Sequence, residues 1–185
     1  MRRLLVSEWV TLDGIYDADS MPQWEVPYNS DDKWNYIKEG ILGCDTMLMG
    51  RVTYEMFAAY WPTQKNNEMG VADKMNKVQK YVVSGTLKKA EWNNSILVKD
   101  HVPEEVAKLK QQPGGDIRIA GSSTLVKSLM ETGLIDEYEF IVHPIIMGKG
   151  KRFFKEDMPL TKLELIETRS FSLGVSVLRY RNTGN

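Results

Sequence analysis

Short apolar runs, each closed by residues typical of turns, recur along the chain. They predict six strands, over residues 2–11, 46–49, 80–84, 96–98, 117–120 and 138–142. Runs of this length that are bounded by Gly, Asn, Asp or Ser favour strands. The stretch from 15 to 28 is rich in Asp, Pro and aromatic residues and predicts a loop, and 63–67 predicts an exposed polar segment.

Amphipathic stretches between these runs predict helices. Ser30-Asp31-Asp32 is a good helix start, because a capping residue is followed by acids that complement the helix dipole, and this helix should reach about Leu42. Three more helices are predicted: one that contains 53–57 and ends at Trp61-Pro62, one from Pro103 to Pro113, and one that follows Gly121-Ser122-Ser123 and ends at Gly133.

The pattern changes near the C-terminus, where residues 160–168 and 175–180 predict two antiparallel strands joined near Ser172-Leu173-Gly174. Alternating strands and helices followed by strands are typical of the α/β class, with a mainly parallel central sheet, helices on both faces and an antiparallel C-terminal edge. The length suits one domain over residues 1–185. An unpaired edge is usually covered, so a homodimer that buries these edge strands, or the apolar residues around Ile145, Ile146 and Phe153, is expected.

Composition narrows the function classes. The net charge is −1, which gives no reason to expect a nucleic-acid or anionic-membrane partner. No apolar stretch approaches the about 20 residues needed to span a bilayer, so a cytoplasmic location is expected. Cys44 is the only cysteine, and His101 and His143 are the only histidines and lie in different segments, so no metal site is expected.

Two strand-to-helix junctions carry the candidate chemistry, at residues 49–53 and 119–124. Each places glycine where a strand ends and hydroxyl residues where a helix begins, and the first adds Arg51. A helix N-terminus offers free N–H groups and partial positive charge to a phosphate, and glycine permits close approach. In open α/β sheets ligands bind beyond the carboxyl ends of strands, so a ligand with two or more phosphates is predicted. Ordinary turn and capping chemistry is the alternative, and no G-x-G-x-x-G or Walker A motif is present.

The sequence also resembles a known superfamily. Residues 48–55 look like the Gly-Arg-x-Thr segment of dihydrofolate reductases. The run through 120–125, 133–137, 144–150 and 153–154 is similar to the C-terminal reductase domain of the bifunctional riboflavin-biosynthesis deaminase/reductase and its stand-alone bacterial relatives. With 11–14, the resemblance spans nearly the whole chain, and it implies a dihydrofolate reductase-like three-layer α/β/α fold. The deaminase motifs H-x-E and P-C-x-x-C are absent from the sequence.

The resemblance implies NADPH as cofactor and assigns roles to ten residues. Arg51, Thr53 and the preceding Gly50 would hold the ribose-phosphate side, Ser84 and Thr86 the adenosine end, Gly121, Ser122, Ser123 and Thr124 the pyrophosphate, and Thr11 would lie near the nicotinamide. The chain departs from its relatives at Gly85, where they often carry a basic residue. Arg51, or Lys88 and Lys89, could bind the extra phosphate instead.

Acids and aromatic residues are the candidates on the substrate side. In dihydrofolate reductases an acid on the first helix protonates or anchors the pterin, and Asp32, beside Asp31, lies near that place. Asp13 is a second catalytic candidate, although helix capping and a turn are structural alternatives for these acids. Aromatic residues that could stack on a flat heterocycle, or simply pack, are Trp9, Trp24, Tyr28 and Trp34.

Together these features predict an NADPH-dependent reductase, similar to the 5-amino-6-(5-phosphoribosylamino)uracil reductases, that acts on a pyrimidine- or pteridine-like small molecule. Dihydrofolate reductase activity is an alternative. A catalytically silent nucleotide-binding sensor and an oligomeric scaffold without a ligand also remain, because a fold does not determine a function.

Overall fold

The computed structural model describes residues 1–184, and over these residues eight strands form one sheet in the order β4-β3-β2-β5-β1-β6-β8-β7. The strands are β1 (Leu4–Thr11), β2 (Thr46–Gly50), β3 (Gln79–Val83), β4 (Ser95–Val98), β5 (Ile117–Ala120), β6 (Glu137–His143), β7 (Leu163–Ser170) and β8 (Ser176–Asn182). Strands β1 to β6 pair in parallel, and β8 pairs antiparallel with both β6 and β7. The mainly parallel sheet with an antiparallel C-terminal edge is therefore confirmed.

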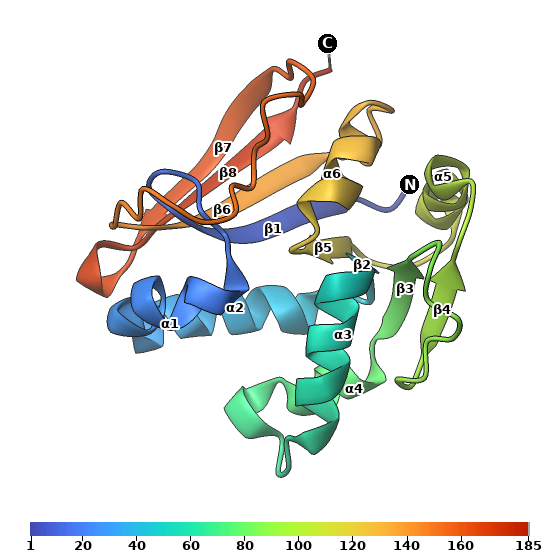
Figure 1. The fold of residues 1–185 in the computed structure, drawn as a ribbon, viewed down its shortest axis with the longest axis horizontal. Coiled ribbons are helices and arrows are strands. Elements are labelled where there is room, and N and C mark those ends of the chain that lie inside the picture. The colour runs from blue at the N-terminus through green and yellow to red at the C-terminus, as the bar shows by residue number, and fades with distance from the viewer. Residues whose placement is uncertain (185) are drawn as a thin grey trace.

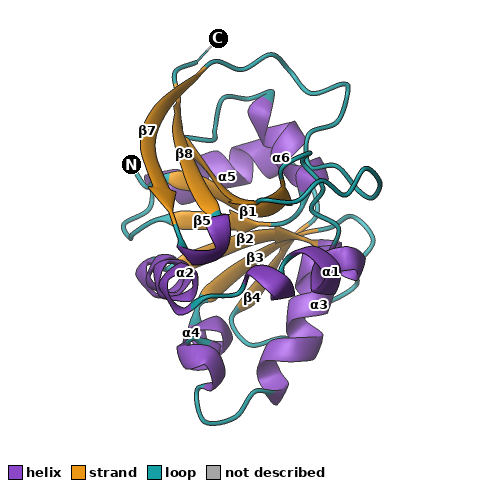
Figure 2. Ribbon diagram, turned by 90° about the vertical axis from the view of Figure 1, so that its left-hand side faces the viewer, coloured by secondary structure: helices purple, strands orange, loops and turns teal. Residues whose placement is uncertain are grey.

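Helices cover both faces of the sheet (Figures 1 and 2). On one face, α5 (Val102–Gln111) and α6 (Ser123–Met130) bury Val106 and Leu129 against strand residues such as Val6 and Ile119. On the other face lie α2 (Asp31–Gly43), α3 (Arg51–Tyr60) and α4 (Ala72–Lys77). This arrangement is the three-layer α/β/α architecture that the sequence resemblance implied.

The central position of β1 explains its composition. It lies between β5 and β6, so apolar side chains on both of its faces are buried. Two polar residues interrupt the strand, Ser7 and Glu8, and both are buried as well. Because successive side chains point to opposite faces, Ser7 lies on the α2 side and Glu8 on the α6 side.

Two segments for which the sequence predicts no helix contain short helices. The chain between β1 and α2 forms α1 (Met21–Trp24), between 3-10 turns at Ala18–Ser20 and Val26–Tyr28. After α3, 3-10 turns at Trp61–Thr63 and Glu68–Gly70 lead into α4, and a further one, Ser172–Gly174, joins β7 to β8. Helices of four and six residues are too short for a 3.6-residue period to show, and burial of Trp24 and Met75 stabilises them instead.

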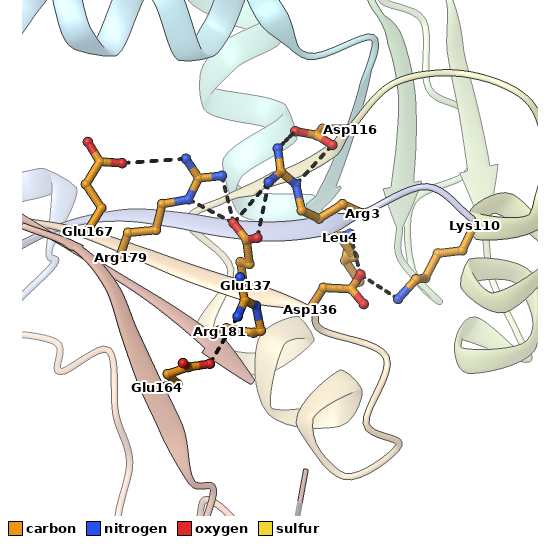
Figure 3. Close-up of polar contacts among 10 residues, drawn as sticks. All are labelled: Arg3, Leu4, Lys110, Asp116, Asp136, Glu137, Glu164, Glu167, Arg179 and Arg181. Carbon is orange, nitrogen blue, oxygen red and sulfur yellow. Dashed lines mark hydrogen bonds and ion pairs between the residues drawn. The ribbon is translucent and has the colours of Figure 1, made fainter. Parts of the chain in front are cut away.

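Asp136 and Glu137, which follow the family pattern, bind neighbouring elements at the end of the sheet where β1 and β6 begin (Figure 3). Asp136 accepts hydrogen bonds from the Leu4 N–H and the Lys110 ammonium, at 2.7 and 2.6 Å. Glu137 pairs with Arg179 at 2.7 Å and Arg3 at 3.1 Å. These pairs connect β1, β6, β8 and α5, which is a structural role.

The homodimer stays a prediction, with one correction to the surface expected for it. Strand β7 forms a sheet edge on which Leu163 and Leu165 are exposed, and Ile146 is also exposed. Phe153 is fully buried within its own chain, against Phe140, and is not available to a partner. Within residues 1–184, every helix is too short or too polar to cross a membrane.

Candidate functional site

The two strand-to-helix junctions singled out in the sequence lie side by side. Strand β2 pairs with β5, and Leu48 is the neighbour of Ile119, so both strands end at the same edge of the sheet. The Ser122 hydroxyl accepts a hydrogen bond from the Gly50 N–H at 2.8 Å and lies 3.0 Å from the Thr53 hydroxyl. The N-termini of α3 and α6 therefore meet around one point.

The backbone at this point is shaped for close approach. Gly121 and Ser122 both adopt left-handed conformations, with φ of 61° and 66°. A Cβ atom at Gly121 would lie 2.7 Å from the Thr53 hydroxyl oxygen, so only glycine fits there without displacing Thr53. This glycine backbone, in close contact with Thr53 and beside two helix N-termini, is a suitable place for phosphate groups.

The remaining cofactor-binding candidates of α6 have partners within the chain. Ser123 is buried, and its hydroxyl lies 2.9 Å from the Tyr16 hydroxyl, which fixes the segment after β1 against α6. Thr124 is exposed, and its hydroxyl accepts a hydrogen bond from Lys155 at 3.3 Å. Thr124 and Lys155 together therefore add an exposed donor and a positive charge at the start of this helix.

Ser84 and Thr86 follow β3, whose last residue, Val83, pairs with Gly50 of β2. The Ser84 hydroxyl accepts hydrogen bonds from the N–H groups of Thr86 and Leu87, at 3.2 and 2.9 Å, and so stabilises a tight turn. Thr86 is exposed at this turn. A third strand end, with its own hydroxyl groups, thus continues the edge formed by β2 and β5.

Arg51 starts α3 but points along its own helix. Its guanidinium group pairs with Glu55, one turn later, at 2.9 Å, and both side chains are exposed. Exposed pairs of this kind contribute little to stability, so a bound anion could replace Glu55 at small cost.

Thr11 and Asp13 form a closed turn at the end of β1. The Thr11 hydroxyl donates to the Asp13 carboxylate at 2.6 Å, and that carboxylate also accepts the N–H groups of Met147 and Gly148, at 3.1 and 2.8 Å. The Thr11 hydroxyl and these amides lower the pKa of Asp13 to about 2, so the carboxylate stays ionised. In this structure Asp13 holds two loops together, and its catalytic role stays a prediction.

A cavity of about 400 Å³ lies beside Trp9, on the face of β1 that α2 covers. Its lining combines two tryptophans, a methionine, two acids and two small polar residues: Trp9, Trp34, Met69, Glu25, Asp31, Asn29 and Ser30. Because Trp9 stands near the end of β1 and Asp31 begins α2, the cavity lies toward the same edge of the sheet as the two junctions. Pockets that pair aromatic walls with a few polar groups are typical of sites for small flat molecules.

Comparison with known proteins identifies the family. The sequence matches the model of the RibD C-terminal domain over residues 2–177. The chain belongs to the RibD C-terminal domain family. The uncharacterized protein YyaP of Bacillus subtilis (strain 168) is 32% identical over 187 residues, which cover 99% of this chain and 96% of YyaP.

Solved structures similar to this RibD C-terminal domain protein include two reductase-type proteins. A pyrimidine reductase-like protein from Corynebacterium diphtheriae superposes with a TM-score of 0.69 at 13% identity, over 100% of this chain and 93% of that chain. Dihydrofolate reductase from Enterococcus faecalis, complexed with NADP(H) and RAB-propyl, superposes with a TM-score of 0.64 at 16% identity, over 98% and 97%. At these identities the likeness shows a shared fold.

The two acids at the start of α2 differ in what they face in this family member. Asp32 is exposed and accepts hydrogen bonds from the Ser172 N–H and hydroxyl groups, at 2.8 and 3.0 Å. The Ser30 hydroxyl and the Ser172 donors hold the pKa of Asp32 below its usual range. Asp32 thus fixes the turn between β7 and β8, and its catalytic role stays a prediction, whereas Asp31 lines the cavity.

One buried acid of the RibD C-terminal domain was missed by the sequence reasoning. Glu8 is 8% exposed, and burial raises its pKa to about 8, although the N–H groups of Trp9 and Gly121 oppose the rise. One carboxyl oxygen accepts the Trp9 N–H at 3.1 Å, and the other has no hydrogen-bond partner among residues 1–184. An acid inside a mainly apolar central strand is the signal that could have identified it.

Proposed function

We propose that this protein is an NADPH-dependent reductase that transfers a hydride to a pyrimidine- or pteridine-like small molecule. The observation that carries the proposal is the meeting of the N-termini of α3 and α6 around the glycine backbone at Gly121. The dinucleotide fits this place because its pyrophosphate needs N–H donors at close range and no side chain in the way.

In the proposed complex the chain binds and orients the dinucleotide. Gly121, Ser122 and Thr124 would hold the pyrophosphate from the start of α6, and Gly50 and Thr53 would hold the adjoining ribose-phosphate side from the start of α3. When bound, NADPH supplies the hydride and is oxidised to NADP⁺, and the acceptor takes up one proton to complete its two-electron reduction. The contribution of the protein is to place donor and acceptor in contact across the end of β1 and to exclude water.

A preference for NADPH over NADH would rest on the charges near the adenosine end. Gly85 provides no charge there, so Arg51 is the best-placed residue for the extra phosphate, since its present partner Glu55 is exposed and easily replaced. Lys88 and Lys89 are exposed further along the same loop.

A matched pair of glycine variants tests the cofactor site. Gly121 and Gly133 flank α6, and both have positive φ, of 61° and 67°. Alanine at either position strains the backbone by about 1 kcal/mol, but only at Gly121 does the new methyl group meet Thr53 and displace this proposed cofactor-binding residue. We expect Gly121→Ala to weaken NADPH binding by at least about tenfold, whereas Gly133→Ala, which has open space around it, leaves binding unchanged.

Binding is measured by fluorescence titration with NADPH and by the shift in melting temperature that NADPH produces. NADPH oxidation with pyrimidine and pteridine acceptors then separates a reductase from a silent nucleotide-binding protein. Equal NADPH affinity of the two variants would show that the site has been placed wrongly. No binding of either NADPH or NADH to the unaltered protein would remove the proposed function altogether.

A further inference from the structure

The cavity beside Trp9 has acidic and aromatic walls but no cation in its lining. Among residues 1–184, no arginine or lysine belongs to the lining, while Glu25 and Asp31 both do. Asn29 and Ser30 add small polar groups, and the indole rings of Trp9 and Trp34 add flat apolar surface. A ligand that fits such walls is flat and offers hydrogen-bond donors to carboxylates.

Neither lysine of α2 belongs to the lining of the cavity. Lys33 is 1% exposed and donates to Glu25 at 2.8 Å, with its ammonium group 5.8 Å from the centre of the Trp9 ring. Taking Lys33 away from Glu25 would leave an unpaired buried carboxylate, which is strongly unfavourable. Lys38, further along α2, lies beside Gly70 and is not part of the lining.

The charge that remains at the cavity is therefore that of Asp31. The Glu25–Lys33 pair is neutral as a unit, and the Asp31 carboxylate makes no ion pair among the described residues. A phosphate group carries up to two negative charges, and recognition of phosphate in proteins normally uses arginine, lysine or a set of free backbone N–H groups. A phosphorylated ligand would bring like charges together here, because the lining has no arginine or lysine, and because Asp31 and Asp32 already offset the partial positive charge of the α2 N-terminus.

We propose that the acceptor bound in this cavity is a flat nitrogen heterocycle that carries amino or ring N–H donors and no phosphate group. The proposal rests on the proposed reductase function, and it distinguishes this protein from a reductase of a phosphoribosylated pyrimidine. Trp9 and Trp34 contact the ring faces, and Asp31 accepts hydrogen bonds from the amino groups.

The test compares 5-amino-6-ribosylaminouracil with its 5′-phosphate, two molecules that differ only in the phosphate. Binding is read from quenching of tryptophan fluorescence in the absence of any dinucleotide, since Trp9 and Trp34 line the cavity. The expected result is that the phosphate-free compound binds at least about tenfold more tightly, because the phosphate meets a like charge in the cavity.

Variants show whether Asp31 is the cause of the preference. Asp31→Lys should reduce or reverse the preference, because it replaces the repelling charge by an attracting one. Asp73→Asn is the control: Asp73 is an exposed acid in the first turn of α4, as Asp31 is in α2, but it does not line the cavity. The control should leave the preference as it is in the unaltered protein.

Equal or tighter binding of the phosphorylated compound by the unaltered protein would overturn the proposal, as would an unchanged preference in Asp31→Lys or quenching by neither compound. Since no dinucleotide is present, these outcomes are independent of the Gly121 and Gly133 comparison. A reductase of another substrate class would show no preference for the phosphate-free compound but would still bind NADPH. A protein without a cofactor site would show no difference in NADPH binding between the Gly121 and Gly133 variants.

Discussion

At pH 9, Glu8→Gln should raise the free energy of unfolding by about 3–5 kcal/mol, and at pH 4 it should change it by less than about 1 kcal/mol. Burial lifts the pKa of Glu8 from 4.5 to about 8 in the folded protein, so folding favours the protonated acid. Glutamine has the shape of that protonated acid and does not ionise, so it keeps the packing and removes the cost of burying a charge.

The direction of the pH dependence follows from the raised pKa. Below pH 4.5 the carboxyl group is protonated in both states, and its environment costs no charge burial. Between pH 4.5 and 8 the unfolded chain ionises while the folded chain does not, so stability is lost as the pH rises. Above pH 8 the folded protein ionises too, and the loss reaches its full size.

Urea denaturation of the two proteins at pH 4, 6, 8 and 9 measures this difference. Lys80, whose pKa burial lowers to about 8, titrates in both proteins and cancels from the comparison. Glu91→Gln, at an exposed acid, is the control and should give no pH-dependent difference. A constant difference between Glu8→Gln and the unaltered protein across this range would show that the pKa of Glu8 is the same in the folded and unfolded states.

The sequence placed most of the elements correctly because burial leaves a direct pattern in it. Strand β1 is apolar on both faces since it is central, and the stripe on α6 follows from its packing on the sheet. The motifs at Gly50 and Gly121 could each be recognised in the sequence. Their contact, however, depends on the pairing of β2 with β5, and 66 residues separate the end of β2 at Gly50 from the start of β5 at Ile117. Sheet order of this kind depends on tertiary packing, which local pattern does not encode.

The positions of the acidic side chains could not be predicted from the local sequence. Adjacent residues on a helix point about 100° apart, so the choice between Asp31 and Asp32 depends on how α2 is rotated against the sheet. The packing of Ile37 against the core sets that rotation. It directs Asp31 to the cavity and Asp32 to the turn at Ser172. Glu8 was missed for a different reason, because its burial depends on β1 lying between β5 and β6, which the strand pattern alone does not show.

The second large effect on stability is expected at a buried ion pair on the face of the sheet that α2 covers. Glu139 and Arg118 are 3% and 7% exposed and are joined by a hydrogen bond of 2.7 Å. Glu139 also accepts hydrogen bonds from Ser7 at 2.8 Å and Tyr36 at 2.7 Å. Burial alone would raise the pKa of Glu139, but Arg118 and these hydroxyl donors lower it, so the carboxylate is ionised at neutral pH. Gly40 makes room for the pair, because a Cβ there would lie 2.7 Å from the guanidinium group.

Glu139→Leu should therefore lower the free energy of unfolding by about 3–5 kcal/mol, because it leaves Arg118 charged and unpaired in a buried position. The double variant Arg118→Met/Glu139→Leu removes both charges and should recover most of that loss, since a buried pair contributes little net stability against apolar residues of similar volume. Urea denaturation of the two single variants and the double variant at pH 7 completes the cycle. If the losses of the single variants simply add in the double variant, then Arg118 and Glu139 are not coupled, and the carboxylate is held by Ser7 and Tyr36 alone.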